Sequence, residues 1–121
     1  MTEIAALRSY FAGVAPIFPH DSVPDDVDYP YFTFDPVMGF FNDGDVPMQI
    51  QLWHRTASDA EINSIARELG RLIGYGGATV MCDSGWLWIK RGTPFMVPIT
   101  TPDDDMVKRR LINVRVEFIT A

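Results

Sequence analysis

The strongest constraint on the fold of this chain is a stretch of alternating side chains between Val46 and Arg55. One set of alternate positions is apolar up to a final histidine: Val46, Met48, Ile50, Leu52 and His54. The other set consists of Gln49, Gln51, Trp53 and Arg55. Successive side chains of a strand point to opposite faces of a sheet, so this period of two predicts a strand with one face toward the core. The other face is mixed, and Trp53 on it is expected to be partly exposed unless a second layer or a partner covers it.

A second long alternation, from Arg109 to Ile119, predicts a final strand of the same kind. The stretch 29–34 is rich in aromatic residues, and the turn at 83–85 predicts a hairpin. Links between the later strands are shorter than the dozen residues that a parallel crossover needs, so the sheet is expected to be mainly antiparallel. The remaining strands are predicted at 78–82, 86–91 and 95–100, the last as an edge strand because it contains Pro98.

Two helices are predicted. Thr2 can cap the first, at 3–13, and Ser58 with Glu61 matches a capping box at the start of the second, which ends at Gly74. The apolar stripe of the second helix comprises Ile62, Ile65, Ala66, Leu69, Leu72 and Ile73. The chain is therefore predicted to be one α+β domain, residues 1–121, with a mainly antiparallel sheet of about four to five strands and two helices packed on one face.

Acidic residues gather in two segments. The segment 16–28 holds three prolines and four aspartates without a basic residue, so it is predicted to be a loop. The clusters are Asp25, Asp26 and Asp28, and Asp103, Asp104 and Asp105. Each is interpreted mainly as a solvated acidic loop, although carboxylates also suit Mg²⁺ or Ca²⁺.

The charge and the single cysteine restrict the class of protein. A net charge of −6 and a pI near 4.6 have the wrong sign for binding a phosphate backbone, so direct nucleic-acid binding is disfavoured. Cys82 has no partner for an internal disulfide, and neither a signal peptide nor an apolar run of membrane-spanning length is evident. Synthesis in a reducing cytoplasm and no membrane association are therefore expected.

The residues that carry chemistry do not form a recognisable catalytic pattern. His20 is expected to be exposed in the acidic loop, His54 to be hydrogen-bonded at the edge of a strand, and Cys82 to be a small buried side chain. The glycines at 70–77 follow a helix instead of opening one, which disfavours a phosphate loop. We therefore expect no enzyme activity and no cofactor, with a small metal-assisted hydrolase using an aspartate cluster and His20 as an alternative.

Several large aromatic side chains are candidates for a protein interface. Aromatic residues anchor many protein–protein contacts. The alternative, that the chain itself covers each of them, is equally open. The candidates are Phe40 and Phe41 beside a predicted turn, Trp53 on the mixed strand face, and Trp86 and Trp88 on one side of the predicted hairpin.

The order of these parts resembles the tail-completion proteins of long-tailed bacteriophages, the family of the tail terminators and of proteins labelled minor capsid protein. The resemblance spans most of the chain. It is carried by a short N-terminal helix, the stretch YPYFTFDP, VPMQIQLWHRT leading into SDAEINSIARELGRLIG, the hairpin GWLWIK and the final RRLINVRVEFIT.

The resemblance implies a structural virion protein with an α+β fold. Such a protein forms a ring, usually a hexamer, that caps the tail tube and joins it to the head connector or stopper protein. It would be made in the cytoplasm of the bacterial host and end in the virion tail, with genome DNA passing through the ring unbound. Both aspartate clusters would then face the lumen and repel DNA. A stand-alone protein-binding adaptor without a phage role is the other alternative.

Overall fold

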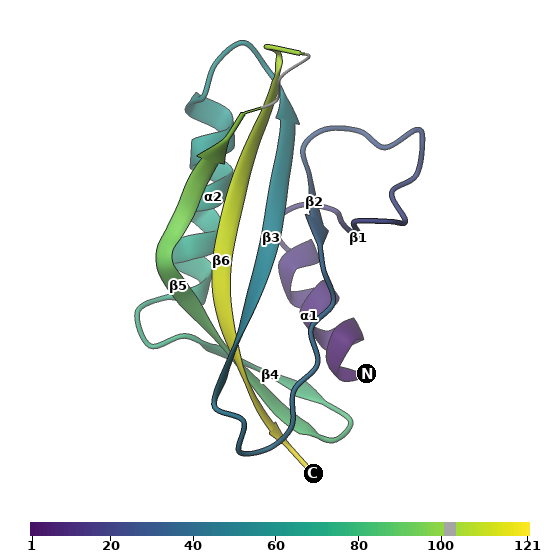
Figure 1. Cartoon of the computed structure of the whole chain (residues 1–121), viewed down its shortest axis with the longest axis vertical. Helices are drawn as coiled ribbons and strands as arrows, with labels where there is room; N and C mark the ends of the chain where they lie inside the picture. Colours follow the sequence, from purple (N-terminus) through teal and green to yellow (C-terminus); the bar gives the residue numbers. More distant parts are fainter. Residues whose placement is uncertain (101–103) are drawn as a thin grey trace.

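The computed structural model describes residues 1–100 and 104–121. Within them, the strands form one curled sheet in the order β1-β2-β3-β6-β5-β4 (Figure 1). The fold is therefore α+β with two helices, and the sheet has six strands instead of four or five. The elements are α1 (Glu3–Ala12), β1 (Ile17–Pro19), β2 (Tyr31–Phe34), β3 (Asp45–Arg55), α2 (Ala60–Ile73), β4 (Ala78–Cys82), β5 (Gly85–Ile99) and β6 (Val107–Thr120).

The two alternating stretches form the centre of the sheet. β3 and β6 pair antiparallel along the whole of β3, from Asp45 opposite Glu117 to Arg55 opposite Val107. The predicted inward face is confirmed, because Met48, Ile50 and the other even-numbered positions of β3 after Val46 are buried. β6 begins two residues earlier than predicted and lies between β3 and β5.

β5 differs from its prediction. The Gly-Thr-Pro sequence at 92–94 was expected to end the strand, but β5 continues through it with a shift of register against β6 between Arg91 and Met96. A bulge accommodates extra residues and a proline without ending the pairing. β4 pairs only with the first part of β5, up to Ile89. The second part lies at the sheet edge, as predicted from Pro98.

The segment 16–28 is not a loop throughout. Ile17–Pro19 forms the three-residue strand β1, which pairs parallel with β2 and places Ile17 opposite Phe32. The eleven residues 20–30 connect the two parallel strands, a link close to the dozen residues that such a crossover usually has. The sheet is consequently mixed, and β2 begins at Tyr31 instead of residue 29.

The predicted cap of α1 is confirmed, and the predicted cap of α2 is wrong. Thr2 Oγ1 accepts a hydrogen bond from the backbone amide of Ala5, as predicted. In α2 the cap is Asp59, whose side chain makes no capping hydrogen bond, and Ser58 Oγ accepts from the amide of Ala60. The expected Ser58–Glu61 capping box is therefore absent.

Both helices pack against the same face of the sheet, and Figure 1 shows them behind it. Leu72, although predicted to belong to the buried stripe of α2, is 48% exposed. No helix among the described residues has the length and apolar character needed to span a membrane. The shared core includes Leu7 and Phe11 of α1, Ile62, Ala66, Leu69 and Ile73 of α2, and Phe32, Ile50, Leu87, Ile112, Val114 and Phe118 of the sheet.

Candidate interaction surfaces

A row of exposed apolar side chains crosses three strands at one end of the sheet. Met81 of β4 lies opposite Trp86 of β5, and Trp86 lies opposite Ile119 of β6. Directly paired residues share a face of the sheet. The residues next to them in the chain, Cys82, Leu87 and Phe118, are buried and point to the core. The row therefore lies on the face away from the helices. Its exposed fractions are 66% for Met81, 45% for Trp86 and 39% for Ile119.

The loop between β2 and β3 adds Phe40 and Phe41 to this end. Phe41 lines a shallow hollow of about 310 Å³ with Ile119 and the last two residues. A tight turn holds the loop, because the amide of Phe40 donates to Asp43 Oδ2 and the amide of Asp43 donates to the carbonyl of Phe40. We call Phe40, Phe41, Met81, Trp86 and Ile119 the apolar end surface.

Charged residues border the apolar end surface. In the next row of the sheet, Asp45 lies opposite Glu117, and its carboxylate accepts hydrogen bonds from Lys90 Nζ and Arg115 Nη1, each at 2.8 Å. The hydrogen bond from Lys90, with the charges of Lys90 and Arg115, lowers the pKa of Asp45. An apolar centre with a polar rim is the usual composition of a protein interface.

The other two predicted interface aromatics already have partners within the chain. The Trp53 ring lies between the ring of Tyr31, stacked at 6.2 Å, and the guanidinium of Arg109, at 4.2 Å from the ring centre. Trp53 Nε1 donates to Thr33 Oγ1 at 2.9 Å. These contacts hold Trp53 half-buried within its sheet row.

Trp88 is held in a similar way. Its Nε1 donates to the carbonyl of Gly76 at 2.9 Å, and Lys90 Nζ lies 3.8 Å from the ring centre. Of the five aromatic candidates, Phe40, Phe41 and Trp86 thus gather at one exposed end, whereas Trp53 and Trp88 pack within the sheet face.

The two aspartate clusters differ in their surroundings. Asp25, Asp26 and Asp28 are exposed in the connection from β1 to β2. Asp104 accepts a hydrogen bond from the amide of Met106 and forms an ion pair with Arg55. The amide of Met106 first, and Arg55 second, lower the pKa of Asp104. Asp105 is exposed, and Asp103 lies outside the described residues.

Each of the two histidines lies beside a carboxylate outside the aspartate clusters. His20 Nδ1 lies 2.5 Å from Asp35 Oδ1. His54 is buried, its Nδ1 accepts from the amide of Arg55, and its Nε2 lies 3.2 Å from Glu61 Oε2 without the angles of a hydrogen bond. In the described part of the chain, no group of three or more His, Cys, Asp or Glu side chains is placed to hold a metal ion.

Cys82 and the glycines of α2 have contacts typical of structural residues. Cys82 is buried, with its Sγ 3.7 Å from Ser84 Oγ, which in turn donates to Glu3 Oε1. Gly70 packs inside α2 against Phe95, and Gly74 ends the helix with a φ of 76°. Since only glycine adopts such a φ readily, Gly74 is suited to end the helix.

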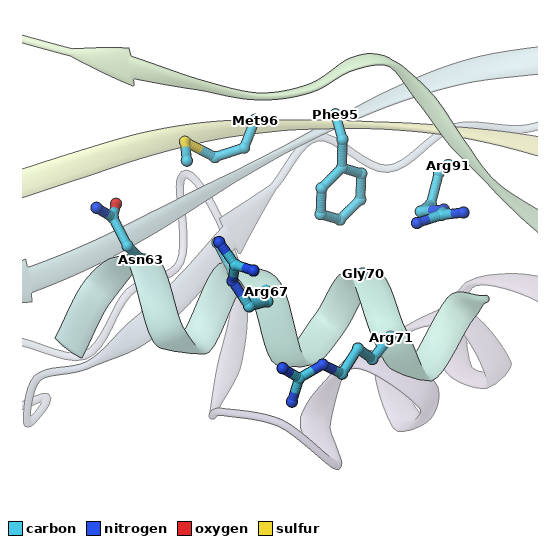
Figure 2. Close-up of a pocket in the computed structure, with 8 residues that line it drawn as sticks. Asn63, Arg67, Gly70, Arg71, Arg91, Phe95 and Met96 are labelled. Carbon is cyan, nitrogen blue, oxygen red and sulfur yellow. The ribbon is translucent and has the colours of Figure 1, made fainter. Parts of the chain in front are cut away.

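A second surface, which was not predicted from the sequence, lies between α2 and β5. A hollow of about 350 Å³ lies there, with Arg67 and Arg71 on the helix and Arg91 and Phe95 on the strand (Figure 2). A neighbouring hollow of similar volume shares Arg91 and Phe95 and extends to Arg115. We call the two hollows the arginine groove. The spacing of four between Arg67 and Arg71, which puts both on one side of a helix, was the signal available in the sequence.

The two surfaces differ in chemistry and position. The apolar end surface uses the ends of β4, β5 and β6, whereas the arginine groove runs along α2 and the middle of β5. Comparisons with protein-family models, with curated proteins and with solved structures give no significant match to this chain.

Proposed function

We propose that this chain is a structural subunit of a bacteriophage tail, whose copies form a ring that caps the tail tube and joins it to the head connector. The proposal starts from the sequence resemblance to tail-completion proteins. The stretches that carry the resemblance coincide with elements of the fold: YPYFTFDP contains β2, VPMQIQLWHRT covers most of β3, SDAEINSIARELGRLIG contains α2, GWLWIK begins β5 and RRLINVRVEFIT covers most of β6.

The observation that carries the proposal is the apolar end surface. Exposed apolar residues gathered in one place, with Trp86 between Met81 and Ile119, are typical of a surface that another protein covers. The loop with Phe40 and Phe41 enlarges this surface at the same end of the sheet (Figure 1). We assign this end to the contact with the tail tube protein.

The charge of the chain supports passage of DNA without adhesion. A subunit with a net charge of −6 repels a phosphate backbone, and a ring multiplies that charge by the number of its subunits. No DNA-binding role is proposed for the chain.

Binding of purified tail tubes tests the assignment. We expect Trp86→Ala to weaken co-sedimentation with the tubes by about thirtyfold or more, the loss typical of an interface anchor. The matched control is Leu72→Ala, which removes a side chain of similar exposure, 48%, from α2 outside the surface. This control should bind as the unchanged chain does.

Two results would count against the proposal. If the unchanged chain does not bind tail tubes, the tail role is wrong. If Trp86→Ala and Leu72→Ala bind equally well, the tube contact lies elsewhere on the molecule. Capture of a protein unrelated to phage tails, lost in Trp86→Ala, would instead support the stand-alone adaptor.

A further inference from the structure

We propose that the acidic loop of one copy, residues 21–28, binds in the arginine groove of the neighbouring copy and forms the side-to-side contact of the ring. This inference rests on the proposed self-assembly and names the residues that would carry it. The occupant of the groove is therefore a second copy of this chain.

The groove concentrates positive charge in an acidic protein. Arg67, Arg71, Arg91 and Arg115 line it, which is four of the ten basic residues of the chain, and no aspartate or glutamate lines either hollow. Guanidinium groups bind carboxylates through paired, charge-assisted hydrogen bonds. The groove therefore fits an acidic segment.

Two of these arginines have no carboxylate of their own. Arg71 lies 3.8 Å from Glu68, and Arg115 pairs with Asp45. Among the described residues, neither Arg67 nor Arg91 forms an ion pair. These two guanidinium groups, one on each wall of the groove, remain available for carboxylates of a neighbour (Figure 2).

The floor of the groove is apolar. Phe95 and Met96 reach from β5 toward α2, and Gly70 leaves space on the helix beneath the Phe95 ring (Figure 2). A Cβ at Gly70 would lie 3.2 Å from Phe95 Cε2, so the ring contacts the helix backbone directly. Such a floor suits a segment that carries small apolar side chains between its acidic ones.

The loop 21–28 has this composition. Its sequence, DSVPDDVD, contains four aspartates, two valines and no basic residue. The amide of Val27 donates to the carbonyl of Pro24, so a turn presents Asp25 and Asp26 at its tip. Both aspartates are exposed, and both valines are half-buried.

Loop and groove lie at opposite sides of the molecule. The loop connects β1 to β2 at one edge of the sheet, whereas β5 and α2 lie toward the other edge (Figure 1). The loop therefore cannot fill the groove of its own chain. Repeated contact between two different surfaces builds a head-to-tail assembly, which closes into a ring when the rotation fits. In this arrangement Asp25, Asp26 and Asp28 contact the neighbour instead of facing the lumen.

Charge reversal tests the contact. Sedimentation at low salt should show that Arg67→Glu with Arg91→Glu raises the dissociation constant of self-association about tenfold or more. Asp25→Arg with Asp26→Arg should do the same. A chain with all four substitutions should recover association, because a reversed loop then meets a reversed groove. The control is Arg55→Glu with Lys108→Glu, which changes the net charge by the same amount as the groove variant but at positions outside the groove. This control should associate more tightly than Arg67→Glu with Arg91→Glu.

Covalent trapping tests the geometry. In a Cys82→Ser background, Ser22→Cys in the loop combined with Thr93→Cys in the groove should give a ladder of cross-linked copies with a short bismaleimide. Ser9→Cys combined with Thr93→Cys, with Ser9 exposed on α1, should not. Absence of the ladder, or failure of the four-substitution chain to associate, would overturn the loop-in-groove contact. If tail-tube binding persisted in that case, the proposed function would stand. A ladder without tube binding would retain the contact and overturn the tail role.

Discussion

Arg110 Nη2 lies 2.9 Å from Asp59 Oδ1, and this contact joins the centre of the sheet to the N-terminal cap of α2. Arg110 occupies an inward position of β6 and is 6% exposed. Its Nε donates to Asn63 Oδ1 and its Nη1 to the carbonyl of Arg109. A buried guanidinium is tolerated only when its donors have partners, so α2 is fixed over the sheet by polar as well as apolar contacts.

Replacing Asp59 with alanine should lower the stability of the fold. The buried Arg110 would lose a charge-assisted hydrogen bond, and such a loss costs about 1.5–3 kcal/mol. Urea unfolding monitored by circular dichroism measures the change. Asp105→Ala, which removes an exposed carboxylate, should stay within about 0.5 kcal/mol of the unchanged chain. Equal stability of both variants would show that the Asp59 contact contributes nothing.

Gly39→Ala should destabilise the loop that carries Phe40 and Phe41. A Cβ at residue 39 would lie 2.4 Å from Cδ2 of the fully buried Phe118, so either the loop or the core must shift. Overpacking of this kind costs about 1–3 kcal/mol. Gly76→Ala is the control, because a Cβ there has no neighbour within 4 Å and the backbone φ is not positive. Thermal unfolding should separate the two variants, and equal melting temperatures would contradict the close packing of residue 39.

The ionised carboxylate of Asp45 should stabilise the fold, and this stabilisation should be lost at low pH. The pKa of Asp45 in the folded protein lies below the ordinary value of 3.8, mainly through the hydrogen bond from Lys90. The stabilisation is therefore present above the unfolded pKa and is lost as the pH falls through the folded pKa. Asp45→Asn should cost about 0.5–1 kcal/mol at pH 7, and this cost should shrink as the pH falls through the folded pKa.

Unfolding in urea at several pH values measures this difference. Lys90→Gln, which removes the largest cause of the lowered pKa, should lose part of the same pH dependence. A constant difference between Asp45→Asn and the unchanged chain at all pH values would show that the effect does not come from ionisation.

The strands β3 and β6 could be predicted from the sequence because their evidence is local. The alternations in β3 and β6 run over residues 46–55 and 109–119, and the structure confirms both strands. β1 could not be predicted in this way, because its three residues become a strand only through pairing with β2, and Ile17 meets Phe32 across a long connection. The capping box is absent because the cap of α2 is Asp59 instead of Ser58, and the Asp59 side chain pairs with Arg110 from a distant strand.

The candidate surfaces show the same limit. Phe40, Phe41 and Trp86 could be identified because large aromatic residues are recognised in a sequence by residue type alone. Met81 and Ile119 were not identified, since their exposure depends on which face of β4 and β6 they occupy. The arginine groove was missed entirely, because Arg67 and Arg91 come together only when α2 packs beside β5.

Replacement of Trp53 separates a structural role of this residue from an interface role. Its ring is enclosed by Tyr31 and Arg109, and its Nε1 donates to Thr33. Trp53→Ala should cost about 2–3 kcal/mol in urea unfolding, less than a fully buried tryptophan because the residue is half-buried. Trp53→Phe, which keeps an aromatic ring but loses the donor, should cost about 1 kcal/mol. If Trp53 instead anchored a partner, Trp53→Ala would leave the unfolding free energy unchanged and weaken tail-tube binding as Trp86→Ala does.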